Sequence, residues 1–123
     1  MGAVSTTKAP AAIGPYSQGF KVGNIVFTSG QLPIDPQTGE VVGLGIEEQA
    51  EQCCRNVGAI LEAAGSGFDK VVKAVCYITD MADFAAFNAV YAKYFVSKPA
   101  RACVAVVGMA KNALCEIEVV AEV

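Results

Sequence analysis

The chain of 123 residues contains no histidine and no tryptophan. Histidine is the side chain that titrates near neutral pH, so its absence excludes Ser-His-Asp and Cys-His nucleophile systems and metal sites built on imidazole. Neither glycine-rich phosphate-binding motif occurs in the sequence. Any chemistry must therefore use carboxylates, tyrosine, thiols, bound water or backbone dipoles.

Charge is also scarce. Only 17% of the residues are charged, the net charge is −3, and no run of lysine or arginine occurs, which argues against DNA as a partner. No stretch approaches the ~18 apolar residues of a membrane helix, so no membrane association is predicted. The length predicts one domain over residues 1–123. The apolar share of 54% indicates that part of the surface is buried against another subunit.

Cysteine is present, but not in a pattern that favours disulfides. The five cysteines include no C-x-x-C pair, and all lie in periodic apolar segments rather than in loops. An odd number of cysteines in such places predicts buried, reduced thiols in a reducing compartment. We expect a cytosolic protein, or a mitochondrial one if the source is eukaryotic.

Hydrophobic periodicity predicts the elements. Spacings of three and four indicate two amphipathic helices, and shorter runs rich in β-branched residues indicate five strands. The order is ββ-α-β-α-ββ, with strands at 17–22, 25–29, 71–79, 101–107 and 114–122 and helices at 46–64 and 83–95. Two helices on one face of a single mixed sheet make a two-layer α/β sandwich. The other face of the sheet has no cover within the chain.

Side-chain alternation predicts what that uncovered face carries. If the wholly apolar sets face the helices, Arg101, Cys103, Glu116 and Glu118 share the uncovered face, together with Val71 and Val75. Periodicity alone favours a wet cross-strand ion pair between Arg101 and Glu116. A partner subunit over the same face would instead create a site for a small anion, because the arginine fork grips a carboxylate with two hydrogen bonds.

Five blocks of residues resemble the Rid family (reactive intermediate deaminase, also called YjgF-type or L-PSP), and the chain is most similar to the RidA enamine/imine deaminases. The blocks span nearly the whole chain in order and with matching spacing. They are Ala11–Gly19, Phe27–Pro33, Asn56–Gly65, Asp83–Phe95, and Pro99–Val104 followed by Glu116–Glu118.

The resemblance implies a chorismate-mutase-like fold and a homotrimer with three sites in the clefts between subunits. It also implies an activity, that of a 2-iminobutanoate/2-iminopropanoate deaminase. Such an enzyme hydrolyses reactive 2-imino acids, and their 2-aminoacrylate-type enamine tautomers, to 2-keto acids and ammonia. The resemblance implies that it needs no cofactor and no metal.

The resemblance assigns a role to each site residue. Arg101 would bind the substrate carboxylate, and Glu116 would activate the attacking water and pass a proton to the leaving nitrogen. Tyr16 would close the pocket from the adjoining subunit. The substrate-binding set would be completed by the backbones of Cys103 and Gly30, by Asn88, and more weakly by Ser29.

Structural alternatives exist for three of these residues. Tyr16 after Gly-Pro suits a packed loop aromatic, Asn88 could serve only to satisfy backbone groups, and Cys103 suits a small buried apolar residue. The chain also departs from the family at two places. The Phe95–Pro99 connection is shorter than in many members, which predicts a more open wall of the cleft, and Cys115 replaces a β-branched residue.

Two other functions stay open. Older descriptions of the family report an endoribonuclease and translation inhibitor. The chain offers no histidine pair, basic groove or obvious stacking platform, which argues against RNA as a partner. A non-catalytic module that binds small carboxylates, or a chaperone-like one, would use the same arginine pocket.

Overall fold

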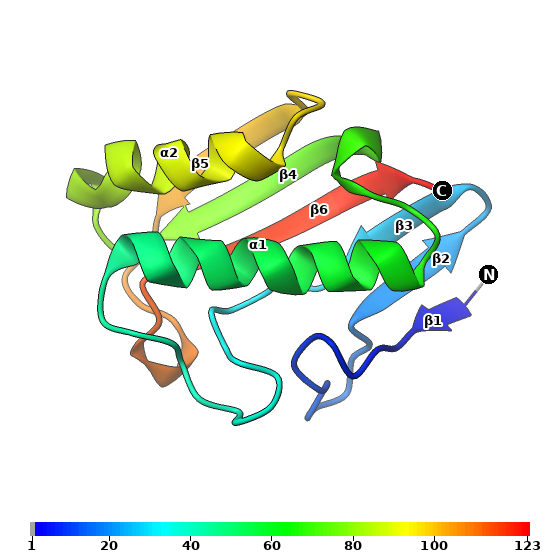
Figure 1. Ribbon diagram of the computed structural model, residues 1–123, viewed down its shortest axis with the longest axis horizontal. Helices are drawn as coiled ribbons and strands as arrows, with labels where there is room; N and C mark the ends of the chain where they lie inside the picture. Colours follow the sequence, from blue (N-terminus) through cyan, green and yellow to red (C-terminus); the bar gives the residue numbers. More distant parts are fainter. Residues whose placement is uncertain (1) are drawn as a thin grey trace.

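A computed structural model describes residues 2–123, in which six strands form one mixed sheet covered by two helices (Figure 1). The strand order across the sheet is β1-β2-β3-β6-β4-β5, and only the β4–β5 pair is parallel. The strands are β1 (Gly2–Val4), β2 (Gly19–Val22), β3 (Ile25–Thr28), β4 (Val71–Ile78), β5 (Ala100–Ala105) and β6 (Cys115–Glu122); the helices are α1 (Ile46–Ala63) and α2 (Phe84–Tyr94).

Both helices lie on the same face of the sheet, as predicted. Helix α1 runs across β6 and β3, and α2 lies beside it over the β4–β5 end (Figure 1). Between the layers the core is closed by fully buried apolar side chains such as Ile60, Phe87 and Ile117. The mixed sheet and two-layer α/β architecture are therefore confirmed.

The ends of α1 follow from local chemistry. The Glu48 carboxylate accepts hydrogen bonds of 3.0 Å from the backbone N–H groups of Leu44 and Gly45, which would otherwise lack partners at the helix start. These two bonds lower the pKa of Glu48. After the last turn, Gly65 takes a φ of 83°, the left-handed conformation that glycine adopts without a Cβ clash.

The predicted strands and helices agree with the observed ones to within one or two residues at nearly every end. Strand β1 was not predicted, because three residues are too short to show an alternation. It pairs with β2 at the edge of the sheet, where Val4 lies opposite Gly19.

The prediction for the faces of β5 is wrong. Arg101 and Cys103 pair with Ala74 and Cys76, which are buried beneath the helices, so both point to the helix side. The apolar set faces outward instead, and Val104 is 44% exposed. From the sequence, we expect the apolar residues of β5 to face the helices. They do not, because α2 offers the Arg101 cation two aromatic rings and the Asn88 amide.

The position of Val71 also differs from the prediction. The pairing of β4 with β6 shifts register between Val71 and Lys73, so Val71 lies opposite Ala121 and is buried. A one-residue bulge moves every side chain beyond it to the other face. Val75, beyond the bulge, pairs with Glu118 and faces outward as predicted.

Candidate active site

The first half of the site is the carboxyl group of Glu116, which lies against Gly30. Glu116 is on β6 and points to the uncovered face. The backbone groups of Gln31 and Ile117 form two hydrogen bonds with each other, which hold the segment after β3 against β6. A Cβ at position 30 would overlap the Glu116 carboxylate, so only glycine permits this approach. Gly30 and Glu116, both predicted as site residues, are therefore neighbours in one chain.

Burial raises the pKa of Glu116 above its usual value, and the nearby Glu118 carboxylate raises it further. Removal from water disfavours the charged form, and a second negative charge acts in the same direction. A carboxyl group shifted in this way holds and releases a proton closer to neutral pH than an exposed glutamate does. This is the behaviour that general acid–base catalysis requires.

Tyr77 is a neighbour of this group that the sequence did not reveal. It pairs with Glu116 across β4 and β6, and its hydroxyl donates a 2.7 Å hydrogen bond to Glu118 Oε1. That bond is the main reason why the pKa of Tyr77 is raised to about 12. The alternation of β4 beyond its bulge could have placed Tyr77 beside the two glutamates, but only with the strand order known.

The second half of the site is Arg101, which α2 holds in a defined orientation. Its Nη1 donates a hydrogen bond to Asn88 Oδ1, and its guanidinium carbon lies 4.7 Å from the ring centroid of Tyr91 and 5.6 Å from that of Phe84. An aromatic face attracts a cation and also fixes the plane of the guanidinium group. Asn88 therefore lies beside Arg101, and its predicted role in binding substrate stays a prediction.

Arg101 opens onto a groove of about 780 Å³ between α2 and the segment that leads into β5. One N–H of the guanidinium binds Asn88, while arginine carries five such donors in a planar fork. The remaining donors suit the two oxygens of a carboxylate.

Arg101 and Glu116 do not meet within one chain. Strand β4 lies between β5 and β6, and the two side chains point to opposite faces of the sheet. The cross-strand ion pair that periodicity favoured is therefore excluded.

The seven predicted residues form two separate groups. Asn88, Arg101 and Cys103 make up one group, and Glu116 and Gly30 belong to the other, together with Tyr16 and Ser29.

Tyr16 and Ser29 belong to the Glu116 side. The Ser29 hydroxyl donates to the carbonyl of Ser17, and its backbone N–H donates to the carbonyl of Gln18, so the Tyr16 loop runs beside the Ser29–Gly30 segment. Tyr16 is 53% exposed. Its predicted role in closing a pocket from the adjoining subunit stays a prediction.

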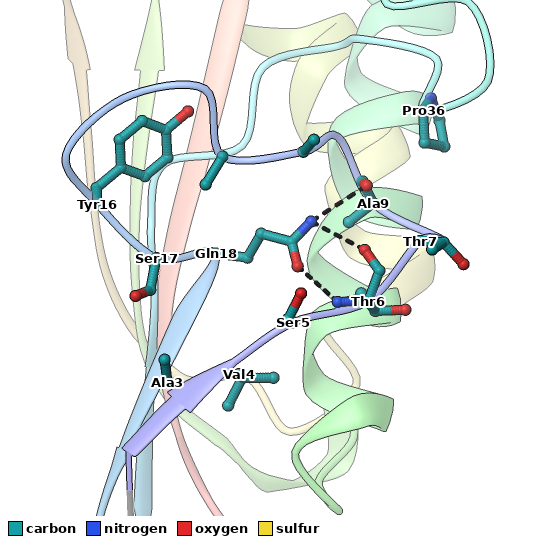
Figure 2. A pocket seen from close by; sticks show the side chains of 12 residues that line it. Ala3, Val4, Ser5, Thr6, Thr7, Ala9, Tyr16, Ser17, Gln18 and Pro36 are labelled. Atoms are coloured by element: carbon teal, nitrogen blue, oxygen red, sulfur yellow. Dashed lines mark hydrogen bonds between the residues drawn. The ribbon is translucent and has the colours of Figure 1, made fainter.

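A buried amide anchors this loop (Figure 2). The Gln18 side chain accepts a hydrogen bond from the Thr6 backbone at 2.7 Å and donates to the carbonyls of Thr6, Ala9 and Pro10. These bonds tie the N-terminal segment to the start of β2 beside a cavity of about 480 Å³, which Tyr16 and Ser17 also line. The sequence analysis did not single out Gln18.

The five cysteines are free thiols, and all but the half-buried Cys103 are buried. Cys53 Sγ lies 3.7 Å from Cys115 Sγ, too far for a disulfide. Burial raises the pKa of Cys76 to about 12 and raises that of Cys103 despite the adjacent Arg101. Raised pKa values disfavour the thiolates of Cys76 and Cys103, which favours packing rather than nucleophilic roles for these two thiols.

Across residues 2–123, no group of three or more potential ligand side chains is placed to hold a metal ion. Over the same residues, neither helix combines the length and apolar character that a bilayer crossing requires.

The fold and the two half-sites define a small α/β protein with a half-buried carboxyl group on an open sheet face and a guanidinium clamp at the sheet edge. The family described as "Endoribonuclease L-PSP" matches residues 6–123. The chain therefore belongs to this family, which is the Rid or YjgF family that its sequence blocks resemble.

Similar proteins cover nearly the whole chain. A RutC family protein of Saccharolobus solfataricus is 52% identical over 120 residues, which cover 97% of this chain and 95% of the relative. A goat (Capra hircus) protein named 2-iminobutanoate/2-iminopropanoate deaminase is 49% identical over 119 residues, covering 96% and 87%. The crystal structure of E. coli TdcF with bound serine superposes with a TM-score of 0.95 at 42% identity, covering 100% of this chain and 99% of that one.

Proposed function

We propose that this protein hydrolyses 2-imino acids and their enamine tautomers, of the 2-iminopropanoate, 2-iminobutanoate and 2-aminoacrylate type, to 2-keto acids and ammonia. The observation that carries the proposal is the half-buried Glu116 carboxyl group against Gly30, whose pKa is raised above that of an ordinary glutamate. The deaminase name of the goat relative supports the same activity.

In this reaction Arg101 binds the substrate carboxylate. Its plane is set by Asn88 and by the Tyr91 ring before substrate arrives. A clamp that is already oriented places the imine carbon without a further loss of freedom on binding. Backbone groups near Cys103, and Tyr16 from the adjoining subunit, complete the binding set in the proposal.

Glu116 activates the water. The ionised carboxylate accepts a proton from water as the water oxygen attacks the carbon of the protonated imine, which gives a carbinolamine. The resulting acid returns that proton to the amino nitrogen, the C–N bond breaks as ammonia leaves, and the hydroxyl proton passes to solvent as the keto group forms. The raised pKa suits both steps, because the group must change its protonation state twice in each turnover.

The complete site requires a second copy of the chain, since Arg101 and Glu116 occupy opposite faces of one sheet. Strand β5 is an edge strand, so the Arg101 side of one protomer can lie over the Glu116 face of its neighbour. Such packing also covers the apolar side chains on that face, including Phe20, Phe27 and Val104. Repeating the contact around an axis closes a homotrimer with three sites.

The test is release of keto acid and ammonia from freshly generated 2-iminopropanoate, measured against the spontaneous rate. The same preparation is incubated with RNA, because the family description names an endoribonuclease. Faster keto-acid release without RNA cleavage supports the proposal. RNA cleavage without deamination would favour the endoribonuclease. Keto-acid binding without either reaction would favour a non-catalytic carboxylate-binding or chaperone-like module.

A further inference from the structure

Tyr77 on β4 connects the positions of the two glutamates that β6 presents on the uncovered face. In the strand register Tyr77 lies directly opposite Glu116, and Val75 lies opposite Glu118. The Tyr77 hydroxyl nevertheless donates its 2.7 Å hydrogen bond to Glu118, the diagonal neighbour. Diagonal neighbours on an antiparallel pair are within reach of a long aromatic side chain. The tyrosine therefore extends from the position opposite Glu116 to the Glu118 carboxylate.

This hydrogen bond fixes where the charge of Glu118 lies. A glutamate on a strand surface otherwise samples several rotamers, and a hydrogen bond to an ionised acceptor is stronger than one between neutral groups. Both Tyr77 and Glu118 are partly buried, which shields the bond from water. The bond is the main cause that raises the pKa of Tyr77 to about 12. The hydroxyl therefore keeps its proton, and stays a donor, at any pH near neutrality.

The other ionisable groups around Glu116 within the chain differ from Glu118 in charge or in distance. On β4, Lys73 shares the outward face but lies four residues from the position opposite Glu116, roughly 13 Å along the strand. Beneath the sheet, burial raises the pKa of Cys53 on α1, so this thiol stays uncharged. The loop beside Ser29–Gly30 adds the phenol of Tyr16. Glu118 is the group whose charge raises the pKa of Glu116.

The proposed assembly brings a charge of the opposite sign to the same carboxyl group. Arg101 of a second copy lies near Glu116 in the shared site, and a cation favours the ionised form of a carboxyl group. Glu116 must also hold a proton during part of each turnover. A negative charge fixed beside it favours the protonated form and so opposes the effect of the arginine.

We infer that Tyr77 and Glu118 are positioning residues for Glu116, because the tyrosine hydroxyl fixes a carboxylate whose charge counteracts the arginine of the neighbouring copy. The inference rests on the proposed deaminase function and specifies what sets the pH range of its site. A Tyr–Glu pair that served only to join two strands would stabilise the sheet without changing proton exchange at Glu116.

Two variants separate the charge from the hydrogen bond. Glu118→Gln keeps an acceptor for the Tyr77 hydroxyl and loses the charge, whereas Tyr77→Phe keeps the charge and frees it to turn into solvent. The kcat/KM for 2-iminopropanoate is measured from pH 5 to pH 8 as a ratio to wild type, which cancels the titration of the substrate itself.

The direction of the change follows from the sign of the charge. The ionised carboxylate of Glu116 is the base, and removing a neighbouring negative charge lowers its pKa. In Glu118→Gln the acid limb of the profile should therefore move to lower pH by roughly 0.5–1 pH unit, a relative gain of about three- to tenfold at the acid end. Tyr77→Phe should move the limb in the same direction by a smaller amount.

The matched control is Glu122→Gln, which removes the same charge from the same strand. Glu122 is exposed on the outward face of β6, four residues beyond Glu118. The two positions are about 13 Å apart, farther than the Debye length of about 8 Å at physiological salt. The pH profile of this variant should match that of wild type. Sedimentation compares the assembly of all variants.

A direct titration does not require turnover. NMR of the glutamate carboxyl carbons follows the protonation of Glu116, whose signal is identified by its loss in Glu116→Gln. Its midpoint should fall in Glu118→Gln and fall less in Tyr77→Phe. Equal midpoints in wild type and Glu118→Gln would overturn the inference, and an unchanged midpoint in Tyr77→Phe alone would overturn the role of the tyrosine. If the wild type hydrolyses no imine, the proposed function fails, while these midpoints still decide whether the pair acts on Glu116.

Discussion

Two glutamates on the same face of β6 have different neighbours. Glu118 accepts a hydrogen bond from the Tyr77 hydroxyl, while Glu116 lies against the bare backbone of Gly30. Burial and the charge of Glu118 raise the pKa of Glu116. The surroundings of each carboxylate, rather than its residue type, therefore decide which one can serve as the acid–base group.

Glu116→Gln should lower turnover by about 10²–10⁴-fold, because the amide has nearly the same shape but cannot exchange the proton. Steady-state rates on 2-iminopropanoate, together with sedimentation to show an unchanged assembly, check this. Activity within a few-fold of wild type would assign the water-activating role to another group.

The same variant should alter the dependence of stability on pH. The pKa of Glu116 is raised in the folded protein, so the fold binds this proton more tightly than the unfolded chain does. Stability therefore falls as pH rises from the unfolded value, near 4.5, through the raised folded value. Relative to wild type, Glu116→Gln should melt at the same or a higher temperature at pH 8, and the difference should shrink at pH 4. A difference that grows toward pH 4 would contradict the direction of this shift.

Arg101→Lys should lose at least about two orders of magnitude in kcat/KM, where each decade corresponds to ~1.4 kcal/mol. A lysine ammonium keeps the charge but cannot form the planar two-bond clamp or stack on Tyr91. Arg101→Ala should lose more while still assembling. Arg55→Lys, at an exposed position on α1, is the matched control. Normal turnover by Arg101→Lys would show that the arginine is structural.

At the scale of elements, buried amides fasten the loops that carry the site. Asn56 on α1 is fully buried, and its Nδ2 donates to the carbonyl of Leu32 at 3.0 Å and to that of Ile34 at 2.9 Å. Only Gln31 separates the segment held in this way from Gly30. Helix α1 therefore does more than cover the sheet, since it also holds the chain that lies against Glu116.

Asn56→Ala should reduce the free energy of unfolding by about 2–4 kcal/mol, because it leaves two carbonyls without a donor and opens a small cavity. Denaturant unfolding at a fixed protein concentration measures this. Gln37→Ala, at an exposed loop position, is the control and should stay within about 0.5 kcal/mol. Equal stabilities for the two variants would show that the Asn56 bonds contribute nothing to the fold.

At the scale of the molecule, the uncovered sheet face is apolar over much of its area. Phe20 and Phe27 pair across β2 and β3 and are each 47% exposed in the single chain. Contiguous apolar surface of this kind marks an interface. A second copy is the occupant that would also bring Arg101 to Glu116.

Sedimentation at micromolar concentration should therefore show a homotrimer. Phe27→Asp should shift the mass toward monomer and abolish deamination together, because the proposed site needs residues from two copies. Lys21→Asp, one strand away on the helix-facing side of β2, is a charge control that should stay assembled. A monomeric wild type would remove the basis for the shared site.

Much of this protein could be predicted from the order of its residues. Helix α1 and its ends follow from an apolar stripe, acidic residues in the first turn and Gly65 at the end, all of which act within a few residues. The strands follow from local alternation in the same way. The absence of histidine limits the possible chemistry through composition alone. The resemblance of five sequence blocks to the Rid family predicted that Arg101 and Glu116 act in the same site.

Only the tertiary structure decided how that pair is arranged. Alternation shows that residues 101 and 103 share a face but not which one, because that depends on the neighbouring strand and on what lies above it. The register of β5 on β4 and the aromatic rings of α2 place Arg101 under the helix. Arg101 therefore lies on the face of the sheet that Glu116 does not share. The bulge at Val71 and the pairing of Tyr77 with Glu116 likewise depend on contacts between strands that are far apart in the sequence. Contacts between residues far apart in the chain have no local signal, and in this protein they divide the site between two subunits in the proposed assembly.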